Sequence, residues 1–200
     1  ATSAATGTRC TAVGHAHIDT AWLWPIAETR RKCLRTFATV DRIMEARPDF
    51  RFLCSQAQQY QWIREDSPDL FRRIAVRVAE GRWEAGGAMW IEPDCNAPSG
   101  ESLVRQVLHG TGWWAEAFGD DAVQRHLYLP DTFGFPASLP QIVRQCGLDT
   151  FITNKISWCE RNRFPHVTFD WVGIDGTEVL THLTPGHNYN SSILPVDLQF

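Results

Sequence analysis

The sequence predicts an α/β fold built on a mainly parallel sheet, either open or closed into a barrel. Short apolar runs alternate with helical patterns along most of the 200 residues. This alternation favours parallel strands joined by right-handed helical connections. Polar residues follow each expected strand, and in such folds the functional groups collect at the carboxyl ends of the strands.

The first expected strand covers residues 9–14, and Pro25 then suits the first position of a helix. An Arg-Pro-Asp sequence at residues 47–49 ends this helix. Its apolar residues recur at helical spacing, at Ile26, Cys33, Phe37, Val40 and Met44.

A second strand over residues 50–54 precedes a helical stretch over about residues 57–79. Ser67 and Pro68 interrupt this stretch. We therefore expect Ser67 to cap a second helix and Pro68 to start it.

Residues 82–89 predict a third strand, in which a Gly-Gly pair allows close backbone approach. Ser99 is the expected N-cap of a helix that extends to about Phe118. A short fourth strand follows at residues 126–129.

The last part of the chain predicts a short helix at residues 138–146 and a fifth strand at residues 150–153. Residues 167–172 and 178–183 predict a hairpin around the Asp-Gly turn at 175–176.

The composition is that of an ordinary globular protein, and the length is enough for one domain with a real core. Hydrophobic residues make up 44% of the chain, charged residues make up 21%, and the formal net charge is −4. No basic surplus indicates binding to nucleic acid or to an anionic membrane. No apolar run is long enough to span a bilayer, and no signal peptide is recognisable.

The six cysteines are widely spaced and form no C-x-x-C pair, which argues against a zinc finger or a redox motif. Cys33 and Cys54 lie in apolar surroundings, so we expect them to be buried free thiols. Free thiols fit a reducing compartment, and the expected localisation is cytoplasmic.

The strongest chemical signal is the run His15-Ala-His17-Ile-Asp19. At the tip of a strand, alternation places these three polar side chains on one side. Zinc and similar ions accept imidazole and carboxylate ligands, so we expect His17 and Asp19 to bind a metal and His15 to orient one of them. The alternative is a pair of hydrogen-bonded histidines that shape the strand end. Trp22 offers a flat apolar wall beside the site.

Asp131 is the second signal, because it follows an apolar strand and precedes Phe133-Gly134 in a tight turn. The alternative role is a helix cap, since aspartate caps helices well. A metal site needs a further anionic ligand, and a carboxylate at a strand end supplies one.

Several other polar residues follow expected strands without a ligand spacing of their own. Glu92 and Asp94 are further carboxylates, which could equally belong to a solvated loop. Lys155 could hold a substrate hydroxyl, tune a carboxylate or be an ordinary surface lysine. His182 and His187 remain candidates for the lining of the pocket.

Three motifs, in order, resemble the α-mannosidases of glycoside hydrolase family 38. They are His-Ala-His-Ile-Asp-Thr-Ala-Trp at residues 15–22, Pro-Asp-Thr-Phe-Gly at 130–134 and the stretch from Phe169 to His182. Ala-Trp-Leu-Trp-Pro at 21–25 is most similar to the cytosolic, bacterial-type branch. The resemblance extends from about Val13 to Tyr189.

The resemblance implies a seven-stranded β/α barrel that is incomplete in this chain. Residues 1–8 are then a linker or an added tail, and residues 9–200 are the N-terminal portion of the catalytic domain. It implies one divalent metal, zinc or alternatively cobalt, with His17, Asp19 and Asp131 as ligands. Asp131 is also the implied nucleophile.

The same resemblance places Trp22 under the sugar ring, Phe133 in the pocket wall and Lys155 beside the nucleophile. It implies retaining hydrolysis of terminal α-linked mannose from oligosaccharides. The family's fourth metal ligand, a histidine, and its acid/base, an aspartate, have no counterpart in this sequence, so we expect both beyond it. The isolated chain is then an inactive piece of an enzyme that has no nucleic-acid or membrane partner, and homo-oligomerisation stays open.

Two other functions remain open at this point. A metal-dependent deacetylase or amidohydrolase on a related barrel would use the metal to activate water. A non-catalytic sugar-binding module would keep the pocket without the missing acid/base.

Overall fold

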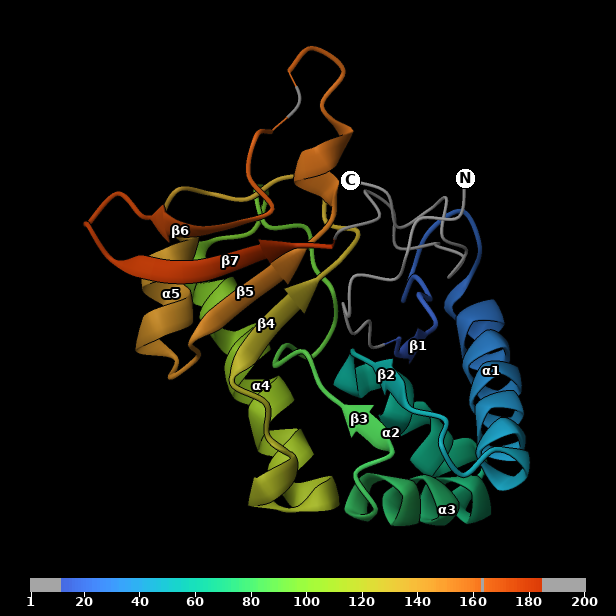
Figure 1. Cartoon of the computed structure of the whole chain (residues 1–200). Helices are drawn as coiled ribbons and strands as arrows, with labels where there is room; N and C mark the ends of the chain where they lie inside the picture. The colour runs from blue at the N-terminus through green and yellow to red at the C-terminus, as the bar shows by residue number, and fades with distance from the viewer. Residues whose placement is uncertain (1–11, 163, 185–200) are drawn as a thin grey trace, which may run out of the picture.

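The structure is a computed structural model that describes residues 12–162 and 164–184. These residues form two sheets with helices packed beside them (Figure 1). The first sheet is parallel, in the order β1-β2-β3, and consists of β1 Gly14–His15, β2 Phe52–Cys54 and β3 Trp83–Ala85.

The second sheet has the order β4-β5-β7-β6, in which β4, β5 and β7 are parallel and β6 is antiparallel to β7. Its strands are β4 His126–Leu129, β5 Thr150–Thr153, β6 Thr168–Val172 and β7 Glu178–Leu183. The predicted hairpin is confirmed, and Gly176 in its turn has a φ of 82° that favours glycine. The predicted α/β class with parallel sheets is also confirmed.

The predicted helices are found close to their expected bounds. They are α1 Ile26–Ala46, α2 Ala57–Asp66, α3 Pro68–Ala79, α4 Gly100–Phe118 and α5 Leu139–Gln145, with short 3-10 turns at Asp120–Ala122 and Lys155–Trp158. Ser99 caps α4, since its hydroxyl accepts a hydrogen bond from the Ser102 N–H at 3.2 Å. Ser67 stands at the N-cap position of α3, but the prediction that its side chain caps the helix is wrong.

None of these helices combines the length and the apolar composition that crossing a bilayer requires.

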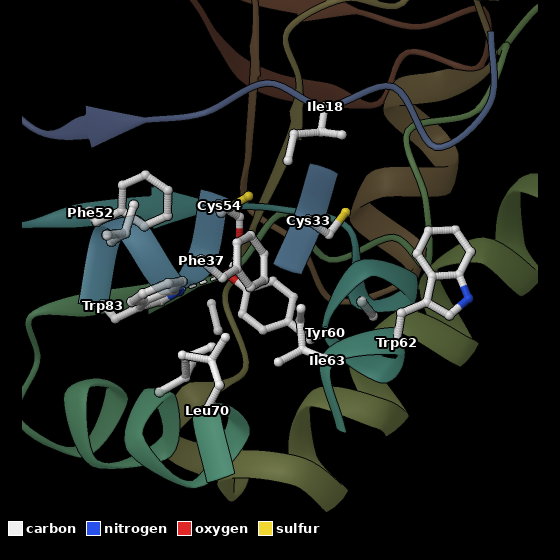
Figure 2. Packing of buried hydrophobic residues seen from close by; sticks show 14 of the residues in the cluster. Ile18, Cys33, Phe37, Phe52, Cys54, Tyr60, Trp62, Ile63, Leu70 and Trp83 are labelled. Atoms are coloured by element: carbon white, nitrogen blue, oxygen red, sulfur yellow. Dashed lines mark hydrogen bonds between the residues drawn. The ribbon is translucent and has the colours of Figure 1, made fainter. Parts of the chain in front are cut away.

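One hydrophobic core lies between the first sheet and helices α1, α2 and α3, and Trp113 and Trp114 of α4 also belong to it (Figure 2). At its centre the hydroxyl of Tyr60 donates to the carbonyl of Cys54 at 2.7 Å and accepts from Nε1 of Trp83 at 2.8 Å. Cys33 and Cys54 are buried free thiols, as predicted, and burial raises the pKa of Cys33 to about 12. This core fixes β1 and β2, whose ends carry polar groups.

A second core lies between the second sheet and helices α4 and α5. Alternate residues of β4 and β5, namely Leu127, Leu129 and Phe151, point into it and are fully buried. This core fixes β4 and β5, whose carboxyl ends precede Asp131 and Lys155.

Two strand predictions differ from the structure. The third strand stops at Ala85 rather than at residue 89, because Gly87 and Ala88 take positive φ angles of 108° and 65° that leave the ladder. A Cβ on Gly87 would approach the Cβ of Ser55 to 2.7 Å, so the chain passes close to the end of β2 here. The described part of the first strand is Gly14–His15, and residues 1–8, the expected linker or tail, lie outside the described residues.

The seven-stranded barrel is not confirmed. In the described part of the chain the strands form two sheets of three and four strands, not one closed sheet. The chain leaves the ladder after β3, at Gly87 and Ala88, and β4 pairs with β5 rather than with β3.

Candidate metal centre

The polar residues after the strands meet at one edge of the molecule. His17 and Asp19 follow β1, Asp131 follows β4 and Lys155 follows β5. Parallel pairing of β4 with β5 brings Asp131 and Lys155 to one edge of the second sheet. Packing between the sheets, such as the ring of His15 on β1 against Tyr128 on β4, brings the end of β1 to the same place.

His17, Asp19 and Asp131 each offer a ligand atom, and these atoms all lie within 4.8 Å of one another. Nε2 of His17 is 3.2 Å from Oδ1 of Asp19 and 3.5 Å from Oδ2 of Asp131. Nitrogen and oxygen ligands about 2 Å from a tetrahedral zinc ion stand about 3.3 Å apart. The donor types and their spacing therefore fit a divalent cation, and His17 would hold it through Nε2.

His15 has a different environment from the one expected for a partner of His17. Its Nδ1 donates to the carbonyl of Leu53 on β2 at 2.9 Å, and its ring packs edge-on against Tyr128 of β4. Burial lowers the pKa of His15 to about 4, which favours the neutral ring. His15 thus ties β1 to both neighbouring strands.

Asp131 forms an ion pair with Lys155, whose Nζ lies 2.6 Å from Oδ1. The Lys155 side chain is only 5% exposed, so it is not an ordinary surface lysine. Its Nζ also lies 3.4 Å from the centre of the Trp158 ring and 4.4 Å from that of Phe133. Asp131 does not cap a helix, because the next helix, α5, starts at Leu139.

Glu92 belongs to this cluster, although its sequence context could not distinguish it from a solvated loop residue. Its side chain is 7% exposed, and Oε1 accepts hydrogen bonds from the Asp131 N–H and from the Thr132 hydroxyl. Oε2 lies 3.5 Å from Nδ1 of His17. Burial raises the pKa of Glu92, and the nearby His17 opposes that rise.

The cluster lies in a pocket of about 510 Å³ whose rim is aromatic. Trp22 and Phe133, both predicted, line it and are 66% and 80% exposed. Trp158, which the sequence did not single out, lines it as well. Exposed aromatic rings around a floor of charged groups suit a small polar ring that has an apolar face.

The remaining candidates stand apart from the cluster. Asp94 lines the pocket but uses Oδ1 to accept from the N–H groups of Asn96 and Ala97, both at 2.7 Å. His182 pairs with Thr168 across the β6–β7 hairpin at 2.8 Å. His187 lies outside the described residues.

Comparison with known families supplies an independent line of evidence. Residues 7–198 match the model of the glycosyl hydrolases family 38 N-terminal domain. The chain is 48% identical over 184 residues to alpha-mannosidase G of Dictyostelium discoideum and 48% identical over 178 residues to human alpha-mannosidase 2C1. These alignments cover 92% and 89% of this chain but only 17% of each relative, so the chain spans a small part of their length.

A solved structure shares the fold. The crystal structure of an alpha-mannosidase from Enterococcus faecalis superposes with a TM-score of 0.72 at 23% identity, over 86% of this chain and 19% of that one. The arrangement of sheets and helices described above therefore recurs in an experimentally determined protein.

Proposed function

The chain belongs to the glycosyl hydrolases of family 38, and from this membership we propose that the complete protein removes terminal α-linked mannose from oligosaccharides. The observation that carries the proposal is the convergence of His17, Asp19 and Asp131 in an aromatic-rimmed pocket. The names of the two 48% identical relatives, both alpha-mannosidases, support the substrate class.

His17, Asp19 and Asp131 would hold one divalent cation, zinc in the first place and cobalt as the alternative. The ligand separations of 3.2 and 3.5 Å support this assignment. When bound, the cation supplies a positive charge that can grip neighbouring hydroxyls of the sugar. Mannose has an axial 2-hydroxyl next to its 3-hydroxyl, so both oxygens can face one ion. The binding energy of these hydroxyl contacts can stabilise a distorted sugar ring that resembles the transition state.

Asp131 is the proposed nucleophile of a retaining mechanism. Its carboxylate attacks the anomeric carbon while the glycosidic bond breaks, and a second carboxyl group about 5–5.5 Å away protonates the leaving oxygen. Water then hydrolyses the glycosyl–enzyme ester. Lys155, 2.6 Å from Oδ1, holds the carboxylate in place. We place the acid/base and the fourth metal ligand in a part of the complete protein beyond this chain.

The aromatic residues position the sugar. Trp22 would stack on its apolar face, Phe133 would form part of the wall, and Lys155 would reach a substrate hydroxyl from the floor of the pocket. A flat aromatic ring under a sugar excludes water from the reacting centre. Its apolar face does not compete with other residues for hydrogen bonds to the sugar hydroxyls.

We also propose the place of this chain within the complete enzyme and the cellular location of that enzyme. Residues 9–200 would be the N-terminal portion of the catalytic domain, and a seven-stranded barrel would be completed by parts of the full protein that this chain does not contain. The isolated chain would be inactive. Buried free thiols such as Cys33, Cys54 and Cys95 support a reducing, cytoplasmic location.

The test uses the complete protein with an aryl α-mannoside and, in parallel, an N-acetylated amino sugar. We expect release of the aryl alcohol and no release of acetate. Acetate release alone would identify a metal-dependent deacetylase, and binding of mannose without turnover of either substrate would identify a sugar-binding module. Both results would refute the proposed function.

A further inference from the structure

Glu92 contacts both loops that supply the candidate metal ligands. Through Oε1 it accepts hydrogen bonds from the Asp131 N–H and from the Thr132 hydroxyl, the latter at 3.3 Å. Through Oε2 it faces Nδ1 of His17 at 3.5 Å. Its two oxygens therefore face ligand loops that follow different sheets.

Oε2 of Glu92 is buried and accepts no hydrogen bond from the residues that the structure describes. A buried carboxylate oxygen without a donor is costly. Nδ1 of His17 lies 3.5 Å from this oxygen, while Nε2 of the same ring faces Asp19 and Asp131. A histidine that binds a metal through Nε2 keeps its proton on Nδ1, which is the donor that Glu92 lacks.

We propose that Glu92 is the positioning residue of this centre: Oε2 fixes the ring and tautomer of His17, and Oε1 fixes the main chain at Asp131. Glu92 acts through these two residues and does not itself bind the metal or the sugar. This inference rests on the metal site of the proposed function.

A layer of hydrogen bonds behind Glu92 keeps it in place. Oε1 of Gln56 accepts from the Glu92 N–H at 3.2 Å and from the Thr20 hydroxyl at 2.6 Å. Nε2 of Gln56 donates to the carbonyl of Ile18, between the two ligands of the first loop, at 3.0 Å. Gln56 has a positive φ of 75°, a strained backbone that persists where several bonds hold it. The Glu92 loop and the His17–Asp19 loop are thus anchored to one side chain.

The test measures Zn²⁺ binding by chelator competition on the complete, metal-stripped protein. Glu92→Gln keeps the size of the side chain and an oxygen that accepts from Asp131 and Thr132, but it replaces the acceptor facing His17. We expect about 10–100-fold weaker Zn²⁺ binding with a melting temperature close to that of the wild type. With Co²⁺ in place of Zn²⁺, the visible absorption spectrum should shift as well, because the ligand field depends on the ring orientation.

Glu84→Gln is the matched control. Glu84 also lies near a histidine, with Oε1 3.7 Å from Nε2 of His126, but this pair does not line the pocket. The control should bind Zn²⁺ as the wild type does. If Glu92→Gln binds Zn²⁺ equally well and keeps the Co²⁺ spectrum, the positioning role is refuted while the metal site stands. If the wild type binds no Zn²⁺, the metal site of the proposed function fails, and this inference fails with it.

A crystal structure of the metal-loaded wild type tests the proposal even if Glu92→Gln does not fold. We expect the contact between Nδ1 of His17 and the Glu92 carboxylate to shorten to about 3 Å. A metal on His17 with this separation beyond about 4 Å would overturn the proposal.

Discussion

Asp131 divides its two carboxylate oxygens between Lys155 and His17. Oδ1 lies 2.6 Å from Nζ of Lys155, and Oδ2 lies 3.5 Å from Nε2 of His17. Lys155 comes from the end of β5 and His17 from beyond the end of β1, so one side chain joins the edges of both sheets. Such an arrangement fixes the orientation of the carboxylate before any substrate arrives.

The nucleophile assignment predicts the effect of Asp131→Asn in the complete protein. The amide keeps the shape of the side chain but cannot attack the anomeric carbon, so kcat on an aryl α-mannoside should fall by more than about 10³-fold. Circular dichroism should show an unchanged fold. Asp175→Asn, in the turn of the β6–β7 hairpin, is the control and should keep its activity. Near-normal turnover by Asp131→Asn would exclude the role.

The stacking assignment predicts that Trp22→Ala weakens substrate binding without affecting stability. Trp22 is 66% exposed, so its removal should change the free energy of unfolding by less than about 0.5 kcal/mol. Loss of the apolar platform should raise KM about tenfold, which corresponds to about 1.4 kcal/mol.

Its neighbour Leu23 provides the control for this experiment. Leu23 is 86% exposed and does not line the pocket. Steady-state kinetics should therefore give wild-type KM for Leu23→Ala. Equal KM values for the two variants would argue against a sugar platform at Trp22.

The two hydrogen bonds of the Tyr60 hydroxyl predict that Tyr60→Phe lowers the stability of the fold. Tyr60→Phe removes the acceptor of the buried Nε1 of Trp83 and one of the two donors to the Cys54 carbonyl, which still accepts from the Gly86 N–H, at a cost of about 1–3 kcal/mol. The temperature of half-inactivation of the complete protein should drop. Tyr128→Phe should have a smaller effect, because in the described part of the chain the Tyr128 hydroxyl makes no hydrogen bond. If both variants lower the temperature of half-inactivation equally, the hydrogen bonds of the Tyr60 hydroxyl do not stabilise the protein.

The reactivity of the cysteine thiols should decrease as their burial increases. Burial raises the pKa of Cys33 and Cys95 to about 12, so both thiols stay almost entirely protonated and unreactive at about pH 8. Cys159 is exposed, and hydrogen bonds from the main chain of Asn162 and Arg161 lower its pKa. Iodoacetamide should therefore label Cys159 well before Cys33 and Cys95, as peptide mass spectrometry can measure. Faster labelling of Cys33 would mean that the first core opens readily.

The sequence predicted the helices well because each carries a local signal. Ser99 caps α4 through its own hydroxyl, and the apolar spacing of α1 was readable without knowing its neighbours. The early end of β3 could not be predicted, since it depends on the positive φ of Ala88, an angle that its residue type does not favour.

The candidate site was only partly predictable for a similar reason. His17 and Asp19 are close in sequence, so their shared direction follows from strand geometry. Glu92 contacts His17 and Asp131 only through the folded arrangement of three loops, and nothing local separates it from the solvated carboxylates of other loops. The environment of His15 likewise depends on Tyr128, which the chain brings in from another sheet.

The most direct measurement of the shared cation is elemental analysis of the complete protein and of its His17→Ala variant. We predict about one zinc ion per chain in the wild type. In the variant, zinc content and mannosidase activity should fall together, because Nε2 of His17 is the atom that faces both carboxylates. Full zinc occupancy in His17→Ala would contradict the account, since the ion would then be held elsewhere.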